Sequence, residues 1–430
     1  MELLTTDEVA RRLGVKKATV YAYVSRGLLS SRRHADGSMF AADEVETFAG
    51  GRRRDLTPAT HTGITLISDG ALYYRGRDVC AMSSTESYEA VAGLLWTGDL
   101  RAIPLTPDPA LRDLAERVTA PLPPSARLTD RLRLIVAAAS AADPLRFDTT
   151  PAGVVATGRT LLGTMVAALP ARSPDRPGDT FAGLLWRRLT AAPSAGVRGL
   201  SAAPSGGVQG LSAAPPEGVQ ALSAAPPDGV EVLDAAPAAG VEVLNAALVL
   251  LADHDLAAST LAARVAASTR AHPYAVVSAG LAAFDGPLHG AASGLVYQLL
   301  TDAADGDPVA AISDRLRAGE TVPGFGHPLY PDGDPRAAAL LAMMPDLPPA
   351  VTELAEAMTR RSGVAPNIDF AIAALALRHG MARDAGEAVF AVARTAGWIA
   401  HALEEYDNQP SRFRPSGRYA GRLPLPASHP

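Results

Sequence analysis

Three short segments of this chain combine histidine, arginine and carboxylate side chains with glycine and proline. In Val322–Arg336, with the sequence VPGFGHPLYPDGDPR, His327 and Arg336 lie nine positions apart. The two glycines before His327 permit backbone conformations and close approaches that other residues disfavour. Asp334 and Pro335 favour a turn that presents Arg336 for bidentate binding of a carboxylate. The segment therefore predicts a site for an anionic substrate.

The other two segments are GPLHGAAS, at Gly286–Ser293, and Ala365–His401. The first predicts that His289 stands at the beginning of a helix. In the second, Asp369 begins an apolar helix with the sequence PNIDFAIAAL. It is either an N-terminal cap or helix-dipole partner or a partly desolvated general base.

Two further charged or polar residues, His254 and Arg394, are interpreted as lying on strongly apolar helices. A charge buried there without a partner would be costly, so each needs either a protein partner or a bound anion. The other six of the nine histidines have no informative neighbours and receive no role: His34, His61, His272, His379, His401 and His429.

Composition indicates a mainly α-helical protein of enzyme size. The 430 residues are 48% hydrophobic but only 5% aromatic, and alanine and leucine favour helices over sheets. Cys80 is the single cysteine, which excludes an internal disulfide and predicts a reducing compartment. No metal site is predicted. The N-terminus lacks a signal sequence and Arg159 interrupts an apolar stretch, so we expect a cytoplasmic protein that does not enter a membrane.

The N-terminal residues predict a winged helix-turn-helix. Thr6 or Asp7 is the expected cap of a helix over Glu8–Leu13, and Lys16–Ser25 forms a second helix. A hairpin with Asp36-Gly37 as its turn follows, and then a third helix from Ala42. Leu4–Phe48 resembles the MerR/excisionase type of DNA-binding domain.

Charge is consistent with this interpretation, because residues 1–54 carry a net +3 while the whole chain carries −6. The hypothesis for DNA binding assigns base-edge contacts to one group of side chains and phosphate contacts to another. These are, respectively, Lys16, Lys17, Thr19 and Tyr21, and Arg32 and Arg33. The alternative is that these charges form the solvated face of a small interaction domain.

A second domain is expected after a linker at 51–60. GITLISDGALYYRGRDV alternates apolar and polar residues as a small hairpin does, and SSTESYEAVAGLLWTGDL predicts a capped amphipathic helix. Between Leu189 and Leu244, leucine recurs every eleven residues in units such as LSAAPPEGVQA. Each unit contains proline and glycine, which break helices, so residues 189–243 are interpreted as a flexible inserted loop. A helix is expected to resume at Leu244.

From about Thr60 to Gly421 the chain resembles the citrate synthase family. The resemblance rests on LYYRGRDV, LLADHDLAAST, GPLHGAAS, VPGFGHPLYPDGDPRA, NIDF, ARTAGWIAHALEE and RFRPSGRYAG, in the family's order. It implies a citrate synthase fold with a large helical domain at 61–285 and 386–430 and a small one at about 286–385. The helix-turn-helix at 1–50 is an addition to that architecture.

The resemblance also implies an acyl-CoA-dependent transferase in which Asp369, His289 and His327 are catalytic. Asp369 would remove a proton from the methyl group of acetyl-CoA, His289 would stabilise the resulting enol, and His327 would protonate the oxaloacetate carbonyl. A set of cationic donors would bind the two carboxylates of oxaloacetate: His254, Arg336, Arg394 and, from the partner subunit of a homodimer, Arg414. No permanently bound cofactor is implied, because acetyl-CoA is a co-substrate.

Two departures from the family pattern affect the CoA side of this prediction. Pro328 and Pro331 stand where family members often carry basic residues, so the phosphates of CoA need other partners, for which Arg360 and Arg361 are candidates. Ala291 and Ser293 replace glycine and asparagine in the His289 motif.

Three alternatives stay open at this point. The first is a 2-methylcitrate synthase that uses propionyl-CoA, since one methylene changes selectivity by only about 1–3 kcal/mol. The second is a DNA-binding regulator with a synthase-like sensor domain. The third makes the N-terminal module a docking or dimerisation element.

Overall fold

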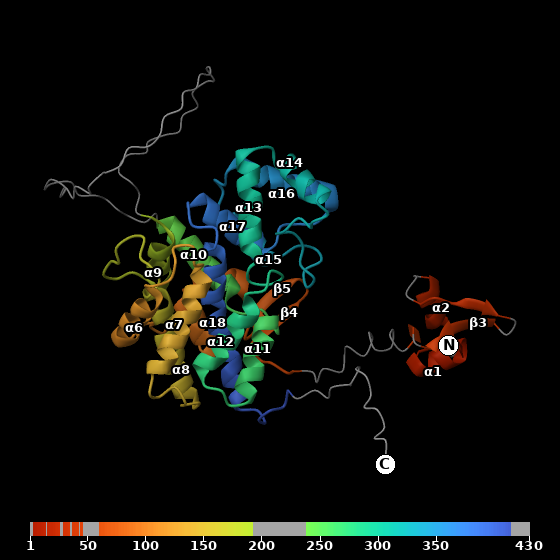
Figure 1. Ribbon diagram of the computed structural model, residues 1–430, viewed down its shortest axis with the longest axis horizontal. Coiled ribbons are helices and arrows are strands. Elements are labelled where there is room, and N and C mark those ends of the chain that lie inside the picture. Colours follow the sequence, from red (N-terminus) through yellow and green to blue (C-terminus); the bar gives the residue numbers. More distant parts are fainter. Residues whose placement is uncertain are drawn as a thin grey trace, which may run out of the picture. The chain divides into compact units, whose positions relative to one another are not determined.

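The structure, a computed structural model, describes residues 3–13, 15–25, 29–34, 37–42, 44–45, 60–191 and 238–413. The chain divides into two compact units, Met1–Thr62 and Gly63–Pro430 (Figure 1). Each unit has its own hydrophobic cluster of buried side chains.

The smaller unit contains the predicted helix-turn-helix, together with a three-stranded sheet. Helix α1 begins with a reciprocal cap, because the Thr5 amide donates to the Glu8 carboxylate (2.8 Å) and the Glu8 amide donates to the Thr5 hydroxyl (3.3 Å). The cap is therefore Thr5, and not Thr6 or Asp7, since only Thr5 precedes the helix. The elements are β1 (Leu3–Thr5), α1 (Thr6–Leu13), α2 (Lys17–Ser25), β2 (Arg32–His34) and β3 (Gly37–Ala41).

The sheet of this unit confirms the predicted hairpin and adds a strand to it. Strands β2 and β3 pair antiparallel, with Arg33 opposite Ser38. Strand β1, which the sequence did not indicate, pairs with the other edge of β3, so the order is β1-β3-β2. The third helix predicted from Ala42 falls largely outside the described residues.

The larger unit is mainly helical, which confirms the predicted fold class. Its described residues form one small sheet, of order β4-β5-β6, followed by helices. The strands are β4 (Thr65–Ser68), β5 (Ala71–Tyr74) and β6 (Arg77–Asp78). The helices are α4 (Val79–Thr85), α5 (Tyr88–Thr97), α6 (Pro109–Thr119), α7 (Leu128–Ala142), α8 (Pro151–Ala167), α9 (Phe181–Leu189), α10 (Ala238–Leu251), α11 (Ala258–Ser268), α12 (Pro273–Phe284), α13 (Ala292–Asp305), α14 (Pro308–Arg317), α15 (Pro335–Ala342), α16 (Pro349–Ser362), α17 (Ile368–Arg378) and α18 (Ala385–Tyr406).

Many helices of this unit begin with proline directly after a capping residue. Proline suits the first helical position because its ring fixes a helical φ and its missing N–H would have no partner there. Helices α6, α8 and α14 start this way, with Asp108, Thr150 and Asp307 as caps. The positions of proline in the sequence thus set where several helices start.

The predicted hairpin and the helix after it are present, with two differences. A third strand, β6, pairs with β5, and a separate short helix, α4, begins after Asp78. Helix α5 is capped by Ser87 but is not amphipathic, since nearly all its side chains from Tyr88 to Trp96 are buried. It packs between other helices, so it has no solvent-facing side.

The repeat segment is bounded by α9, which ends at Leu189, and α10, which begins at Ala238. Residues 192–237 lie outside the described part of the chain. The last repeat unit was expected to be loop up to Val243, but its second half is helical. Gly240 belongs there because a side chain at that position would meet the Trp186 ring, only 2.4 Å from the ideal Cβ position.

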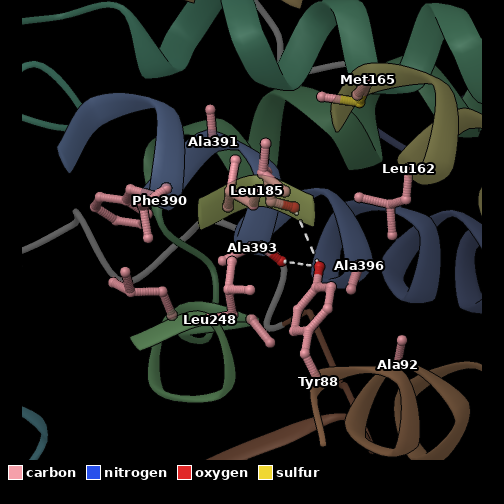
Figure 2. Close-up of a cluster of buried hydrophobic side chains, with 14 of the residues drawn as sticks. Tyr88, Ala92, Leu162, Met165, Leu185, Leu248, Phe390, Ala391, Ala393 and Ala396 are labelled. Atoms are coloured by element: carbon pink, nitrogen blue, oxygen red, sulfur yellow. Dashed lines mark hydrogen bonds between the residues drawn. The ribbon is translucent and has the colours of Figure 1, made fainter. Parts of the chain in front are cut away.

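The core of the larger unit is built around the long helix α18, which is buried along nearly its whole length. It packs against α5, α7, α8, α10, α11 and α12. Figure 2 shows hydrogen bonds within this core. The Tyr88 hydroxyl donates to the carbonyl oxygens of Ala393 (2.9 Å) and Val392 (3.1 Å). A buried tyrosine hydroxyl needs such a partner.

A second hydrophobic cluster lies between α13, α14, α16 and α17, at the top of the larger unit in Figure 1. Val296, Leu300, Leu354 and Phe370 are among its buried members. The cluster falls inside the segment 286–385, for which a small domain is predicted.

Candidate active site

His254 lies in a turn between two helices, and not on a helix as predicted. Helix α10 ends at Leu251 and α11 begins at Ala258. Between them, Asp255 has a left-handed backbone (φ 52°), which aspartate tolerates better than most residues. The hydroxyl of Tyr74, on β5, accepts from the Asp253 amide (3.0 Å) and donates to its carbonyl (2.8 Å). The small sheet therefore anchors the turn that carries His254.

The His254 side chain is buried among aromatic rings. Its Nε2 lies 2.9 Å from the Tyr330 hydroxyl, and its ring centroid is 5.1 Å from that of His327. Burial, reinforced by the positive charges of Arg336 and Arg394, lowers the pKa of His254 well below 6.5. His254 is thus a neutral hydrogen-bonding group, which corrects the expectation of a cationic donor.

His327 is held by a loop that is tied to the segment before Asp369. Gly324 and Gly326, with φ of 89° and 73°, give this loop its shape. The Asn367 amide donates to the Gly324 carbonyl (2.9 Å), and its side-chain nitrogen donates to the Gly326 carbonyl (3.0 Å). Nδ1 of His327 accepts from the Leu329 amide (3.2 Å), so in the neutral ring Nε2 carries the hydrogen. Burial lowers the pKa of His327, which favours that neutral form.

Asp369 occupies the first turn of α17, and the cap of that helix is Asn367 instead. The Asn367 side chain accepts from the amides of Asp369 and Phe370. Asp369 is half-buried, and its Oδ1 is buried with no hydrogen-bond partner in the part of the chain that the structure describes. Burial raises the pKa of Asp369 to about 7, although Arg336 and Arg394 oppose the shift. A carboxyl with that pKa can accept or release a proton near neutral pH.

Arg336 is buried and already carries an internal counter-charge. Asp334 caps α15 and binds the guanidinium in a bidentate pair, with contacts of 2.9 and 2.8 Å. Asp334 also accepts from the Ile368 amide (3.0 Å), directly before Asp369. The sequence indicated a bidentate role for Arg336, but that fork is occupied by Asp334.

Arg394, on α18, is equally buried and has fewer partners. Its Nε donates to the Leu251 carbonyl (2.9 Å), and its Nη2 is buried without a hydrogen-bond partner among the described residues. Burial lowers the pKa of Arg394, but guanidinium keeps its charge in proteins. A buried, incompletely bonded cation beside His254 is suited to receive an anion.

His289 lies in the loop Asp285–Ala291 between α12 and α13, and its Nε2 is 2.7 Å from the Ser259 hydroxyl. The indole Nε1 of Trp398 donates to the same hydroxyl oxygen (3.3 Å). This arrangement favours a Ser259 hydroxyl that donates to His289, which leaves the ring hydrogen on Nδ1. Burial lowers the pKa of His289 to about 4. The ring is therefore neutral and can donate a hydrogen bond from Nδ1.

A buried charged network continues from the His254 turn to the end of α18. Asp253 accepts from the Thr65 hydroxyl (2.5 Å) and lies 3.2 Å from Nε2 of His401, whose Nδ1 contacts Arg264 (2.7 Å). Arg264 pairs with Glu404 and Glu405, and Glu405 pairs with Arg412 at 2.6 and 2.7 Å. No role is predicted for His401 from the sequence alone. The pattern that could have indicated one is the spacing of polar side chains, one turn apart, on an otherwise apolar helix.

Some predicted site residues lie elsewhere. Arg360 and Arg361 are exposed in the last turn of α16, where Arg360 pairs with Glu356 (2.9 Å). They line a cavity of about 390 Å³ with α14 and are not tied to the Asp369 loop. Arg414 lies outside the described residues.

Most of the predicted DNA-binding residues fall on α2 and β2 of the smaller unit, and Lys16 lies directly before α2. Lys16, Lys17 and Tyr21 are exposed, Thr19 is half-buried, and Lys17 pairs with Asp7 (2.6 Å). Arg32 and Arg33 lie in β2, and their side chains are outside the described part. Within the described ranges, no group of three or more histidine, cysteine or acidic side chains is placed to hold a metal ion. None of the described helices has the length and apolar character needed to span a bilayer.

A helical protein with this buried set of histidines, arginines and a carboxyl of raised pKa has the features of an enzyme. The family model for citrate synthase, C-terminal domain, matches residues 55–416, and a helix-turn-helix domain model matches residues 3–53. The chain belongs to the citrate synthase family, with a helix-turn-helix domain at its N-terminus.

Individual relatives match over a shorter stretch. The chain is 39% identical to the citrate synthase of Haloferax volcanii over 190 residues, which are 42% of this chain and 50% of that protein. It is 32% identical to 2-methylcitrate synthase 1 of Corynebacterium glutamicum over 185 residues, 41% of this chain and 48% of that protein. The chain thus spans about half the length of the relatives it matches.

Solved structures show the same fold over a longer stretch. The citrate synthase of Thermoplasma acidophilum, in a ternary complex with carboxymethyl coenzyme A and oxaloacetate, aligns with a TM-score of 0.63 and 22% identity. The alignment covers 87% of this chain and 98% of that one. The citrate synthase of Thermotoga maritima aligns with a TM-score of 0.59, over 86% of this chain and 96% of the other.

Proposed function

We propose that this protein condenses acetyl-CoA with oxaloacetate and water to give citrate and CoA. The observation that carries the proposal is the Asp369 carboxyl, whose pKa is raised to about 7 beside two buried arginines and neutral histidines. Asp369 removes a proton from the acetyl methyl group, and the new carbon–carbon bond forms at the oxaloacetate carbonyl. Water then hydrolyses the thioester and CoA leaves as the thiol.

The two catalytic histidines act in this proposal as neutral donors. His289, with its hydrogen on Nδ1, donates to the thioester oxygen as negative charge develops there. His327, with its hydrogen on Nε2, polarises and protonates the carbonyl oxygen of oxaloacetate. A neutral donor suits a weakly acidic carbon, because the enol keeps a hydrogen bond without requiring a full proton transfer.

Oxaloacetate carries two carboxylates, and the site offers unequal arginines for them. Arg394 has a buried Nη2 with no partner in the described structure, so it is the stronger candidate for a direct contact. Arg336, already paired with Asp334, supplies charge beside it, and His254 donates a neutral hydrogen bond. Arg414, from the partner subunit of a homodimer, completes the set in this proposal.

The test is release of thiol from acetyl-CoA in the presence of oxaloacetate. We expect release that depends on both substrates and is lost in Asp369→Asn. Absence of thiol release at high enzyme and substrate concentrations overturns the proposal. Propionyl-CoA in the same assay decides between citrate and 2-methylcitrate synthesis, and a higher kcat/KM with propionyl-CoA assigns the latter.

For CoA itself, the proposal keeps Arg360 and Arg361 as candidate phosphate contacts. Arg360→Gln with Arg361→Gln is expected to raise the KM for acetyl-CoA and leave the KM for oxaloacetate unchanged. Unchanged kinetics for both substrates would show that these exposed arginines only face solvent.

For the N-terminal unit we propose DNA binding, supported by the helix-turn-helix match at residues 3–53 and the exposed Lys16, Lys17 and Tyr21. The expected result is salt-sensitive binding to a DNA site near the protein's own gene. Deletion of residues 1–54 should abolish that binding and leave turnover unchanged. Loss of the dimer on deletion would instead assign the unit to assembly.

A further inference from the structure

A cavity of about 720 Å³ lies against the loop that carries His289 but outside the candidate active site. Pro287 and Ala291 of that loop line it, as does Gly294 at the start of α13. Among the described residues, none of those assigned to acetyl-CoA or oxaloacetate chemistry is in its walls. The remaining walls come from α7 and the segment before it, from 170–172, from Arg188 and from the start of α18.

The cavity is strongly cationic. Five arginines line it, against two acidic residues: Arg127, Arg131, Arg172, Arg188 and Arg383, with Asp384 and Glu387. Five positive charges in the wall of one cavity repel each other unless anions lie close by. The arginines of the cavity differ in whether a carboxylate of the protein lies close to them.

Two of the arginines have carboxylate partners. Arg127 contacts Asp285 (2.7 Å), Asp130 (3.1 Å) and Glu387 (3.6 Å). Arg188 is buried and paired with Asp175, at 2.8 Å for its Nη2. These two arginines hold the walls together.

The other three have no ion pair within the described part of the chain. Arg131 donates only to the carbonyls of Thr119 and Pro123, both at 3.3 Å. Arg383 donates from Nε to the Gly294 carbonyl (3.0 Å), and the side chain of Arg172 has no partner among the described residues. They come from three separate elements: α7, the segment after α8, and the segment before α18. Charge of one sign from three directions focuses the field on the cavity.

The two acidic wall residues offset only part of this charge. Asp384, which accepts a hydrogen bond from the Leu128 amide at the start of α7 (2.6 Å), supplies one negative charge against the five arginines. Burial raises the pKa of Glu387 to about 7, so this carboxyl is only partly ionised near neutral pH.

The rest of the lining narrows the ligand class. It consists of proline, alanine, leucine, serine and glycine, and no aromatic side chain of the described residues lines the cavity. Without a ring to stack on a base, recognition must come from anionic groups bound by arginine forks, which match phosphate geometry. The volume is within the range of small-molecule sites and exceeds that of one phosphate group.

We propose that this cavity binds a small phosphorylated ligand with at least two phosphate charges. Bound there, the ligand contacts Pro287 and Ala291 and so lies against the loop that carries His289. The proposal stands without the role proposed for His289. Ala291 and Ser293, which depart from the family pattern, lie in the same loop and the helix start after it.

The experiment is isothermal titration calorimetry of the full chain with inorganic tripolyphosphate as the probe. We expect saturable binding, with one site per chain, that weakens as salt is raised. The double variant Arg131→Gln with Arg172→Gln should lose at least tenfold in affinity. Arg172→Gln alone should lose part of it, and this side chain is exposed, so the single variant keeps the fold. Arg317→Gln removes an exposed arginine on α14 outside the cavity and should bind like the wild type.

Several outcomes overturn the proposal. They are no binding at millimolar probe, equal weakening by Arg317→Gln, and displacement of the probe by stoichiometric CoA, which would make the cavity part of the acyl-CoA site. Citrate binding as tightly as tripolyphosphate would overturn the assignment to phosphate. Because calorimetry needs no turnover, these results are independent of the thiol-release assay.

Discussion

The two groups of arginines near the His289 loop differ in how far they are buried and in how their positive charges are paired. Arg336 and Arg394, in the candidate active site, are 2% and 1% exposed, and each is held in place by fixed protein groups. Arg131, Arg172 and Arg383 line the outer cavity, lack ion pairs in the described structure, and are exposed or half-buried. Burial makes each charge costly and therefore constrains it. The inner group is therefore fixed by burial and by protein partners, whereas the outer group is less constrained in the described structure.

Replacement of Asp369 should give the largest effect, because the inner arginines are arranged around this carboxyl. Asp369→Asn is expected to lower kcat by about 10²–10⁴-fold, the usual contribution of a general base. The measurement is thiol release, with Asp346→Asn, an exposed residue paired with Arg378, as the control. A loss below tenfold would remove Asp369 from the chemistry.

The stability of the same variant separates lost chemistry from lost folding. The folded pKa of Asp369 is about 7 against an ordinary 3.8, so the ionised carboxylate destabilises the fold. That destabilisation is absent below about pH 4, grows as the pH rises and is complete above about 7. Asp369→Asn should therefore raise the Tm at pH 8 and change it little at pH 4. A lower Tm at pH 8 would contradict the assigned burial.

The two inner arginines should respond differently to the same substitution. Arg394→Gln is expected to raise the KM for oxaloacetate roughly 10- to 100-fold with little change in Tm, because a charged hydrogen bond contributes about 1.5–3 kcal/mol. Arg336→Gln leaves Asp334 buried without its partner, which costs about 3–5 kcal/mol of folding stability. Equal Tm values for the two variants would contradict the stabilising role of the Asp334–Arg336 ion pair.

The pH dependence of kcat/KM should reflect the ionisation of Asp369. A base with a pKa of about 7 must be ionised to act, so kcat/KM should fall about tenfold for each unit below that pH. His289, with a pKa of about 4, stays neutral in this range and should not affect the profile. A profile that is flat between pH 5.5 and 8 would show that another group removes the proton.

The smallest effect is expected from the outer group. Arg172→Gln should leave kcat and KM within about twofold of wild type when no phosphorylated ligand is present, because this exposed side chain contacts no residue of the inner site. A larger loss in the absence of ligand would mean that the outer arginines already belong to the substrate site, and the comparison between the two groups would fail.

Much of the candidate site could be predicted from the sequence, because its residues sit in local motifs. His289, His327, Arg336 and Asp369 each lie beside the glycine, proline or asparagine that shapes their loop, and those neighbours act within a few residues. Tyr330, Ser259 and Trp398 could not be predicted in the same way. Their contacts join segments from 30 to 139 positions apart, a separation over which no local pattern operates.

The break between α10 and α11 shows the same limit. The apolar sequence from Leu244 to Ser268 favours one continuous helix, but Asp253 is held by Thr65, Tyr74 and His401, which come from the sheet and from α18. Those partners favour the turn over the helix. Helical propensity is weak in comparison with buried charged hydrogen bonds.

By itself the sequence determined the mainly helical fold, the N-terminal helix-turn-helix and the family, because these depend on composition, periodicity and contiguous motifs. Only the tertiary structure decided that His254 is neutral and that Arg336 is already paired with a carboxylate. It also decided that, within the described residues, Nη2 of Arg394 has no hydrogen-bond partner and three arginines without ion pairs gather in one outer cavity. Charge state and pairing depend on burial and on distances between segments remote in the chain, and the packing of the helices around α18 sets both.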